Sequence, residues 1–282
     1  MAPGPSCRLA ASVRVFDRHP ANGSRLHVTV FCPVSSAMPT RPVEESARTR
    51  ARLKKILSIL ETASPDARLE LDFSTPLELL VALILAAQSR DVLVNELTRE
   101  LFPRFRTPAD WANAKPAELE DTLRRLNMGR IKAAGIRNAC RALVERFGSR
   151  VPDNLPDLLT LPRVGRKTAN VLLGNAYGRD VLGVDTHVAR LSHRLGFTFE
   201  NDPDAIEEAL MKIVPAGWRV RFTHLMQLHG RRICIAKKPK CPECPVRKLC
   251  PYPLKTPPDI RKTSADSAAS KRKKVTLRRK AE

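Results

Sequence analysis

Aromatic and acidic residues are both scarce in this sequence. Among 282 residues, 5% are aromatic, with two Trp and two Tyr, and 29 Asp and Glu stand against 50 Lys and Arg. Proteins that bind single strands by stacking bases on aromatic rings usually have more such rings, so the composition argues against that class. The formal net charge of +21 indicates a polyanionic partner, and a nucleic-acid duplex bound through its backbone fits both observations.

Long apolar runs are also missing. The longest, Leu79 to Ala87, has the length of a buried helix and falls well short of the roughly 18 residues that a membrane span needs. We therefore expect no membrane partner. No convincing signal peptide is present, so we expect the seven cysteines to remain outside a disulfide framework. The expected location is the bacterial cytoplasm, near the nucleoid, or an organelle or nucleus if the host is eukaryotic.

Strand-like alternation of apolar and polar residues is nearly absent, so we predict an all-α fold. First-turn prolines such as Pro76, and Gly148 after an apolar helical pattern, mark helix ends. The predicted helices cover residues 76–88, 91–101, 108–114, 116–126, 130–147, 156–160, 166–177, 185–195, 203–214 and 218–233. Residues 1–40 are predicted to be a disordered N-terminal extension, and residues 254–282 a disordered basic tail.

The segment Leu-Pro-Arg-Val-Gly-Arg-Lys-Thr-Ala, residues 161–169, lies between two predicted helices. A tight hairpin there would point backbone N–H groups outward at a helix N-terminus, which makes an anion site suited to a DNA phosphate. An ordinary helix–helix turn explains the segment equally well. Lys167 lies in the first helical turn, where it is a candidate nucleophile for a Schiff base, although most lysines are simply solvated.

A second motif is Val-Asp-Thr-His-Val, residues 184–188, in which Asp185 precedes a predicted helix. Aspartate is a favoured N-cap, and this structural role explains its position well. A carboxylate near the candidate lysine could also move protons. Both roles can hold at once.

Four cysteines fall in one short stretch with the spacing Cys-x6-Cys-x2-Cys-x5-Cys: Cys234, Cys241, Cys244 and Cys250. Thiols this close usually form a metal site in an intracellular protein. Zinc is one candidate, although only one Cys-x2-Cys pair is present, and a cuboidal iron–sulfur cluster is another. A metal group that fixes the loop after the first cysteine would direct three cations toward a phosphate backbone: Lys237, Lys238 and Lys240.

These three motifs, in this order, resemble the endonuclease III family over roughly residues 48–253. The resemblance implies a helix–hairpin–helix fold with two lobes and a DNA site in the cleft between them. One lobe is a six-helix barrel at residues 69–179, with the hairpin at 161–166. The other joins residues 41–68, including a helix near 48–64, to residues 180–253, and holds a [4Fe–4S] cluster on the four cysteines.

Matched position by position, the resemblance makes Lys167 the catalytic lysine and Asp185 the catalytic aspartate. Gln88 matches a glutamine that fills the hole left by an extruded base, and Met128 an apolar wedge entering from the opposite side. The hairpin would contact DNA through Arg163, Gly165 and Arg166. Arg163 departs from the family, which has glycine there, so either the backbone avoids positive φ or a strain of about 1 kcal/mol or more is tolerated.

The resemblance implies a bifunctional DNA glycosylase and abasic-site lyase, acting as a monomer on damaged double-stranded DNA. It would remove oxidised pyrimidines through a lysine Schiff base and cut the strand 3′ of the site by β-elimination. One alternative is a monofunctional adenine-type glycosylase, but such relatives lack the hairpin lysine and normally carry an extra C-terminal domain. Another is a non-enzymatic duplex-binding module with a structural zinc, which would bind with steep salt dependence and never cleave.

Overall fold

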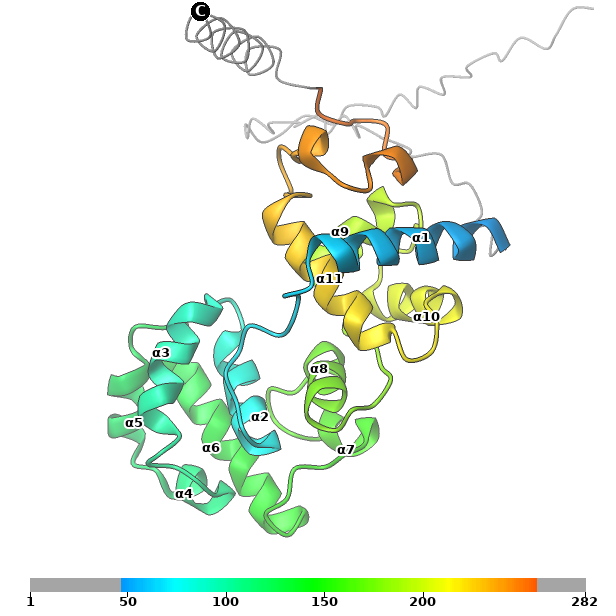
Figure 1. Ribbon diagram of the computed structural model, residues 1–282. Coiled ribbons are helices and arrows are strands. Elements are labelled where there is room, and N and C mark those ends of the chain that lie inside the picture. Colours follow the sequence, from blue (N-terminus) through cyan, green and yellow to red (C-terminus); the bar gives the residue numbers. More distant parts are fainter. Residues whose placement is uncertain (1–46, 258–282) are drawn as a thin grey trace, which may run out of the picture. The chain divides into compact units, whose positions relative to one another are not determined.

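The computed structural model describes residues 47–257, and every regular element in this range is helical (Figure 1). In chain order the helices are α1 (Ala47–Ala63), α2 (Pro76–Ala86), α3 (Asp91–Leu101), α4 (Pro108–Asn113), α5 (Pro116–Leu123), α6 (Gly129–Arg146), α7 (Leu155–Leu159), α8 (Arg166–Ala176), α9 (Thr186–Arg194), α10 (Pro203–Ile213) and α11 (Arg219–Arg232). Two short 3-10 turns follow, at Cys241–Glu243 and Arg247–Leu249. The all-α prediction is confirmed for this part of the chain. The predicted disorder at 1–40 and beyond residue 257 lies outside the described residues.

Prolines and short polar side chains fix the helix starts, as the sequence predicted. α2 begins at Pro76, and the Thr75 hydroxyl accepts a hydrogen bond from the Glu78 N–H at 3.2 Å. A reciprocal capping box between Thr107 and Asp110 starts α4. Each such cap contributes about 1 kcal/mol to helix stability. All predicted helices are present, with ends that shift by at most three residues.

The larger hydrophobic cluster is built around α2. This helix is buried on nearly all sides, with Leu79, Leu80 and Leu85 fully enclosed, and it packs against α3, α6 and α8. Trp111 and the leucines of α3 to α7 complete the same cluster. Because α2 packs against α8, the loop that follows α2 and the hairpin that precedes α8 are attached to the same hydrophobic cluster.

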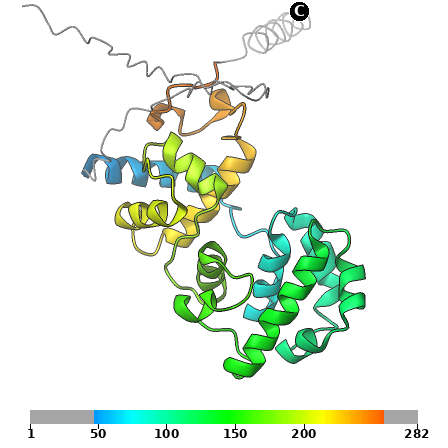
Figure 2. The ribbon, with the colours of Figure 1, turned by 180° about the vertical axis from the view of Figure 1, so that it is seen from behind.

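A second cluster joins the beginning and the end of the described chain. α1 packs against α10 and α11, far away in sequence, as both ribbon views show (Figures 1 and 2). Leu53, Phe197 and Phe222 are fully buried in it. The predicted lobe boundaries remain a prediction, because the described residues group as one compact unit. No helix among residues 47–257 is long and apolar enough to cross a membrane.

His224 on α11 makes the stability of the fold depend on pH. Burial, and secondly the charge of Arg221, lower the pKa of His224 from 6.5 to about 4. The unfolded chain therefore binds this proton more readily, and stability is lost as the pH falls from about 6.5 to 4, by no more than about 3 kcal/mol. We expect His224→Gln to reduce this loss, measured by urea unfolding at pH 7 and pH 4.5. An equal loss in both proteins would contradict the assignment.

Candidate active site

The hairpin before α8 is a tight turn that forces an arginine into a left-handed conformation. The Val164 N–H donates to the Leu161 carbonyl at 3.2 Å, and Arg163 has a φ of 68°. Proline at the second position and positive φ at the third define a type II turn, which favours glycine at the third position. Of the two expected outcomes, the structure shows that strain is tolerated at Arg163, at about 1 kcal/mol.

The side chain of Arg163 lies over Gly135 of α6. A Cβ atom built on Gly135 would come within 2.7 Å of Arg163 Cγ and 3.6 Å of its Nε. The missing side chain at Gly135 therefore makes room for the stem of the arginine. Nothing in the sequence connects these two residues, since Gly135 lies in α6 and Arg163 in the turn before α8.

Lys167 is the second residue of α8 and its side chain is exposed. The N-cap, Gly165, offers no side-chain acceptor, so no cap covers the N–H groups of the first turn. Arg166, predicted to contact DNA, instead forms a two-pronged ion pair with Glu207, with both N–O distances at 3.0 Å. A DNA contact by Arg166 stays a prediction.

Asp185 is the N-cap of α9, as predicted, and its second oxygen is held as well. Oδ1 accepts hydrogen bonds from the backbone N–H groups of His187 at 2.9 Å and Val188 at 2.7 Å. Oδ2 accepts one from Nε2 of Gln227 on α11 at 3.1 Å. The carboxylate is half-buried and fixed by three donors. Sequence reasoning missed Gln227, because it stands in the apolar pattern of α11 without a motif around it.

The segment before Asp185 lies along the first two turns of α8. The Asn170 side chain donates to the Leu182 carbonyl at 2.9 Å, and a Cβ on Gly183 would lie 3.8 Å from the Lys167 carbonyl. These contacts bring the two predicted catalytic residues, Lys167 and Asp185, onto adjoining segments.

His187, two residues after Asp185, lies next to this site. Burial lowers the pKa of His187, and the negative charge of Asp185 opposes the shift, while Arg190 adds to it. Its Nδ1 lies 3.2 Å from Arg190 Nη2. The imidazole is therefore favoured in its neutral form beside the fixed carboxylate.

Gln88 and Met128 lie at two loops that meet. Both have a φ of 54°, and the Asn127 amide reaches Gln88 Oε1 at 3.5 Å. Met128 is 39% exposed and directly precedes α6. Met128, Arg163 and Gly165 also line a common pocket with residues of α2 and α8. The structure thus brings together four of the residues predicted to contact DNA.

A buried lysine that the sequence did not single out supports the Gln88 loop. Lys132 of α6 is 3% exposed, and its Nζ donates to the Leu85 carbonyl at 2.8 Å and to Ser89 Oγ at 2.7 Å. Burial lowers the pKa of Lys132. Both acceptors flank the loop that carries Gln88, so Lys132 fixes that loop to α6.

The four clustered cysteines line one pocket. All are free thiols, and apolar side chains including Leu191, Leu195, Ile233 and Val246 close the space around them. Within residues 47–257, no group of three or more His, Cys, Asp or Glu side chains lies close enough together to hold a single metal ion. The cavity that these residues enclose measures about 30 Å³.

The surroundings of these thiols disfavour four thiolates unless a positively charged group lies among them. Burial, together with the charges of the three neighbouring cysteines, raises the pKa of Cys244 to about 11, although a backbone hydrogen bond from Val246 lowers it. Four thiolates therefore need a metal group to offset their mutual repulsion. Two nitrogen atoms lie close to these sulfurs: Arg194 Nη1 donates to Cys234 Sγ at 3.3 Å, and His229 Nε2 lies 3.5 Å from Cys244 Sγ. The residues present fit an iron–sulfur cluster held by cysteines.

The loop between the first two cysteines exposes its lysines. Lys237, Lys238 and Lys240 are all exposed, and the Lys240 N–H donates to the Ile233 carbonyl at 2.9 Å, which closes the loop. Their contact with DNA stays a prediction.

The strained turn at Arg163 yields a testable pair of effects. Arg163→Gly should stabilise the fold by about 1 kcal/mol, because glycine adopts positive φ without a steric penalty. If the guanidinium contacts a phosphate, the same change should reduce the slope of log affinity against log salt by about one. Thermal melting and binding to duplex DNA at several salt concentrations measure the two effects. Arg163→Lys is the control that keeps the charge, and an unchanged slope in Arg163→Gly would contradict the phosphate contact.

Comparisons with known proteins agree with this geometry. The family model of the HhH-GPD superfamily base excision DNA repair protein matches residues 81–216. An endonuclease III of Synechocystis sp. is 44% identical over 213 residues, 74% of this chain and 96% of that protein. An endonuclease III of Escherichia coli strain K12 is 39% identical over 203 residues, 72% of this chain and 96% of that protein.

Solved structures give the same result. The structure of a trapped covalent intermediate of an endonuclease III with DNA superposes with a TM-score of 0.69 at 39% identity, covering 72% of this chain and 95% of that one. The structure of a thermostable thymine-DNA glycosylase superposes with a TM-score of 0.64 at 26% identity, covering 73% of this chain and 96% of that one.

Proposed function

Because this chain belongs to the endonuclease III family of base excision repair DNA glycosylases with abasic-site lyase activity, we propose that Lys167 is its nucleophile and Asp185 its assisting carboxylate. One observation carries this assignment: the exposed amine-bearing turn of α8 adjoins the segment that ends in the fixed carboxylate. The trapped covalent intermediate of a relative with 39% identity supports a covalent route.

In the proposed reaction, the neutral amine of Lys167 attacks C1′ of the damaged nucleotide, and the bond from C1′ to the base breaks with its electron pair leaving on the base. The nitrogen then loses one proton, and its lone pair forms the C=N bond of a protonated imine as the bond from C1′ to the ring oxygen breaks and that oxygen takes up a proton. The imine makes the C2′ proton acidic, and its loss expels the 3′ phosphate by β-elimination. Asp185 takes the proton of the attacking amine and stabilises the cationic intermediates.

The fixed position of Asp185 suits this role. Three hydrogen bonds orient its two oxygens, so the carboxylate needs little rearrangement when positive charge develops on the nitrogen. The substrates that we propose are oxidised pyrimidines in duplex DNA, flipped out of the stack by a monomeric enzyme. Gln88 fills the vacated position and Met128 enters the stack as an apolar wedge.

We further propose that Cys234, Cys241, Cys244 and Cys250 hold a [4Fe–4S] cluster. Such a group would cross-link the chain after α11 and keep the lysines of the following loop facing a phosphate backbone. The shared pocket and the absence of disulfides between these four cysteines support it.

The nucleophile is tested by borohydride trapping on duplexes that contain thymine glycol or an abasic site. The native protein should form a covalent adduct, and Lys167→Ala should form none, because the imine that borohydride reduces cannot form. Lys54→Ala, which removes an exposed lysine of α1, is the matched control and should trap normally. An adduct from a folded Lys167→Ala protein would refute the assignment.

The cluster is tested with Cys244→Ala. We expect a lower folded yield, a loss of brown colour and fewer than the roughly four iron atoms per chain that one cluster supplies. Cys140→Ala is the control, since Cys140 is buried in the other hydrophobic cluster and should leave iron content unchanged. Zinc in place of iron in the native protein, or normal colour in Cys244→Ala, would count against the proposal.

A further inference from the structure

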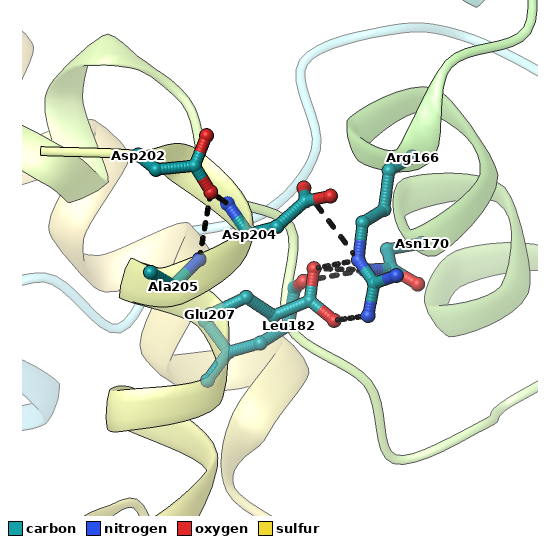
Figure 3. A network of polar contacts seen from close by, with 7 residues as sticks. All are labelled: Arg166, Asn170, Leu182, Asp202, Asp204, Ala205 and Glu207. Atoms are coloured by element: carbon teal, nitrogen blue, oxygen red, sulfur yellow. Dashed lines mark hydrogen bonds and ion pairs between the residues drawn. The ribbon is translucent and has the colours of Figure 1, made fainter. Parts of the chain in front are cut away.

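Glu207 is the only buried carboxylate among residues 47–257, and the side chains that hydrogen-bond to it, Arg166 and Asn170, lie on α8. It stands on α10, in the second hydrophobic cluster, and is 9% exposed. Arg166 donates to its two oxygens, and Asn170 Nδ2 donates to Oε2 at 2.8 Å (Figure 3). A buried carboxylate is costly unless its partners are in place, so this arrangement is a strong local constraint.

The two donors lie one helical turn apart, and each borders a part of the proposed site. Arg166 directly precedes Lys167 in the first turn of α8. The Asn170 amide, 3% exposed, also donates to the Leu182 carbonyl, three residues before Asp185. One carboxylate therefore fixes the start of α8 and, through Asn170, the segment that leads to Asp185, as Figure 3 shows for Arg166, Asn170 and Leu182.

The pairing also changes what Arg166 can do. The hydrogen bond that Arg166 donates to Glu207 is the main cause that raises the pKa of Arg166, so the guanidinium stays charged beside this carboxylate. Asp204 adds a weaker contact at 3.7 Å from a carboxylate that is 60% exposed. The guanidinium is thus a structural tie between α8 and α10.

We propose that Glu207 is a positioning residue for the lyase and glycosylase reaction, which holds Lys167 and Asp185 at the separation that Schiff-base formation needs. The inference rests on the proposed roles of these two residues. Displacements near 1 Å of a reacting group can slow a reaction by about two orders of magnitude, whereas binding energy spread over many phosphate contacts is little affected. The mark of such a residue is therefore a slower chemical step at nearly unchanged affinity.

The test uses Glu207→Gln, which keeps the size of the side chain and removes its charge, and Asn170→Ser, which removes the link to Leu182. Single-turnover borohydride trapping on an abasic-site duplex gives a rate constant and, from its amplitude, the active fraction. Affinity is measured on a duplex with a tetrahydrofuran abasic analogue. We expect the rate constant per active molecule to fall at least about tenfold in both variants, with affinity changed less than about threefold.

The control is Asp204→Asn on the same helix, which should keep the native rate constant. A native rate constant in both Glu207→Gln and Asn170→Ser would overturn the inference, and so would a loss of amplitude alone, since that reports fewer folded molecules. Lys167→Ala in the same assay separates the two proposals. If it forms no adduct while Glu207→Gln reacts normally, the proposed function stands and the positioning role falls; if Lys167→Ala still forms an adduct, both fall.

Discussion

The enclosure of α2 is the constraint on which the rest of the described structure depends. A helix that is apolar on all sides is stable only when other elements cover every face, and α3, α6 and α8 do so here. This enclosure fixes where α2 ends, and therefore where the loop with Gln88 begins. It also fixes the face on which α8 starts, and with it the hairpin. The two sides of the proposed DNA site are thus consequences of one buried helix.

Conformational strain gathers on the same face. Gln88, Met128 and Arg163 are three of the four non-glycine residues with positive φ among residues 47–257, and the sequence assigned all three to DNA contact. Such conformations persist only where the surroundings enforce them. Here Lys132 ties down the Gln88 loop, and Gly135 leaves space for Arg163. Residues that the surrounding structure already holds in one conformation would lose less conformational freedom if they contact DNA as proposed.

The sequence predicted features that are determined by residues close together along the chain. Helix starts followed from Pro76 and similar positions, the Asp185 cap from its place before a helix, and the cysteine site from its spacing. It did not predict contacts between residues distant along the chain. Gln227 reaches Asp185 across 42 positions, and Lys132 reaches Leu85 across 47. Nor did it predict the ion pair of Arg166, because the helix start alone does not reveal the carboxylate of Glu207, which packing brings from α10.

The contact between Gly135 and Arg163 has a consequence for the history of the family. A relative with glycine in the hairpin has no stem to accommodate and is free to carry a side chain at the position of Gly135 on α6. A relative with a long side chain in the hairpin, such as arginine, should need glycine at the position of Gly135, because a Cβ there would overlap the stem of that side chain. The two positions should therefore change together during evolution, so that co-variation, and not the identity of either residue alone, identifies members that hold the hairpin in this way.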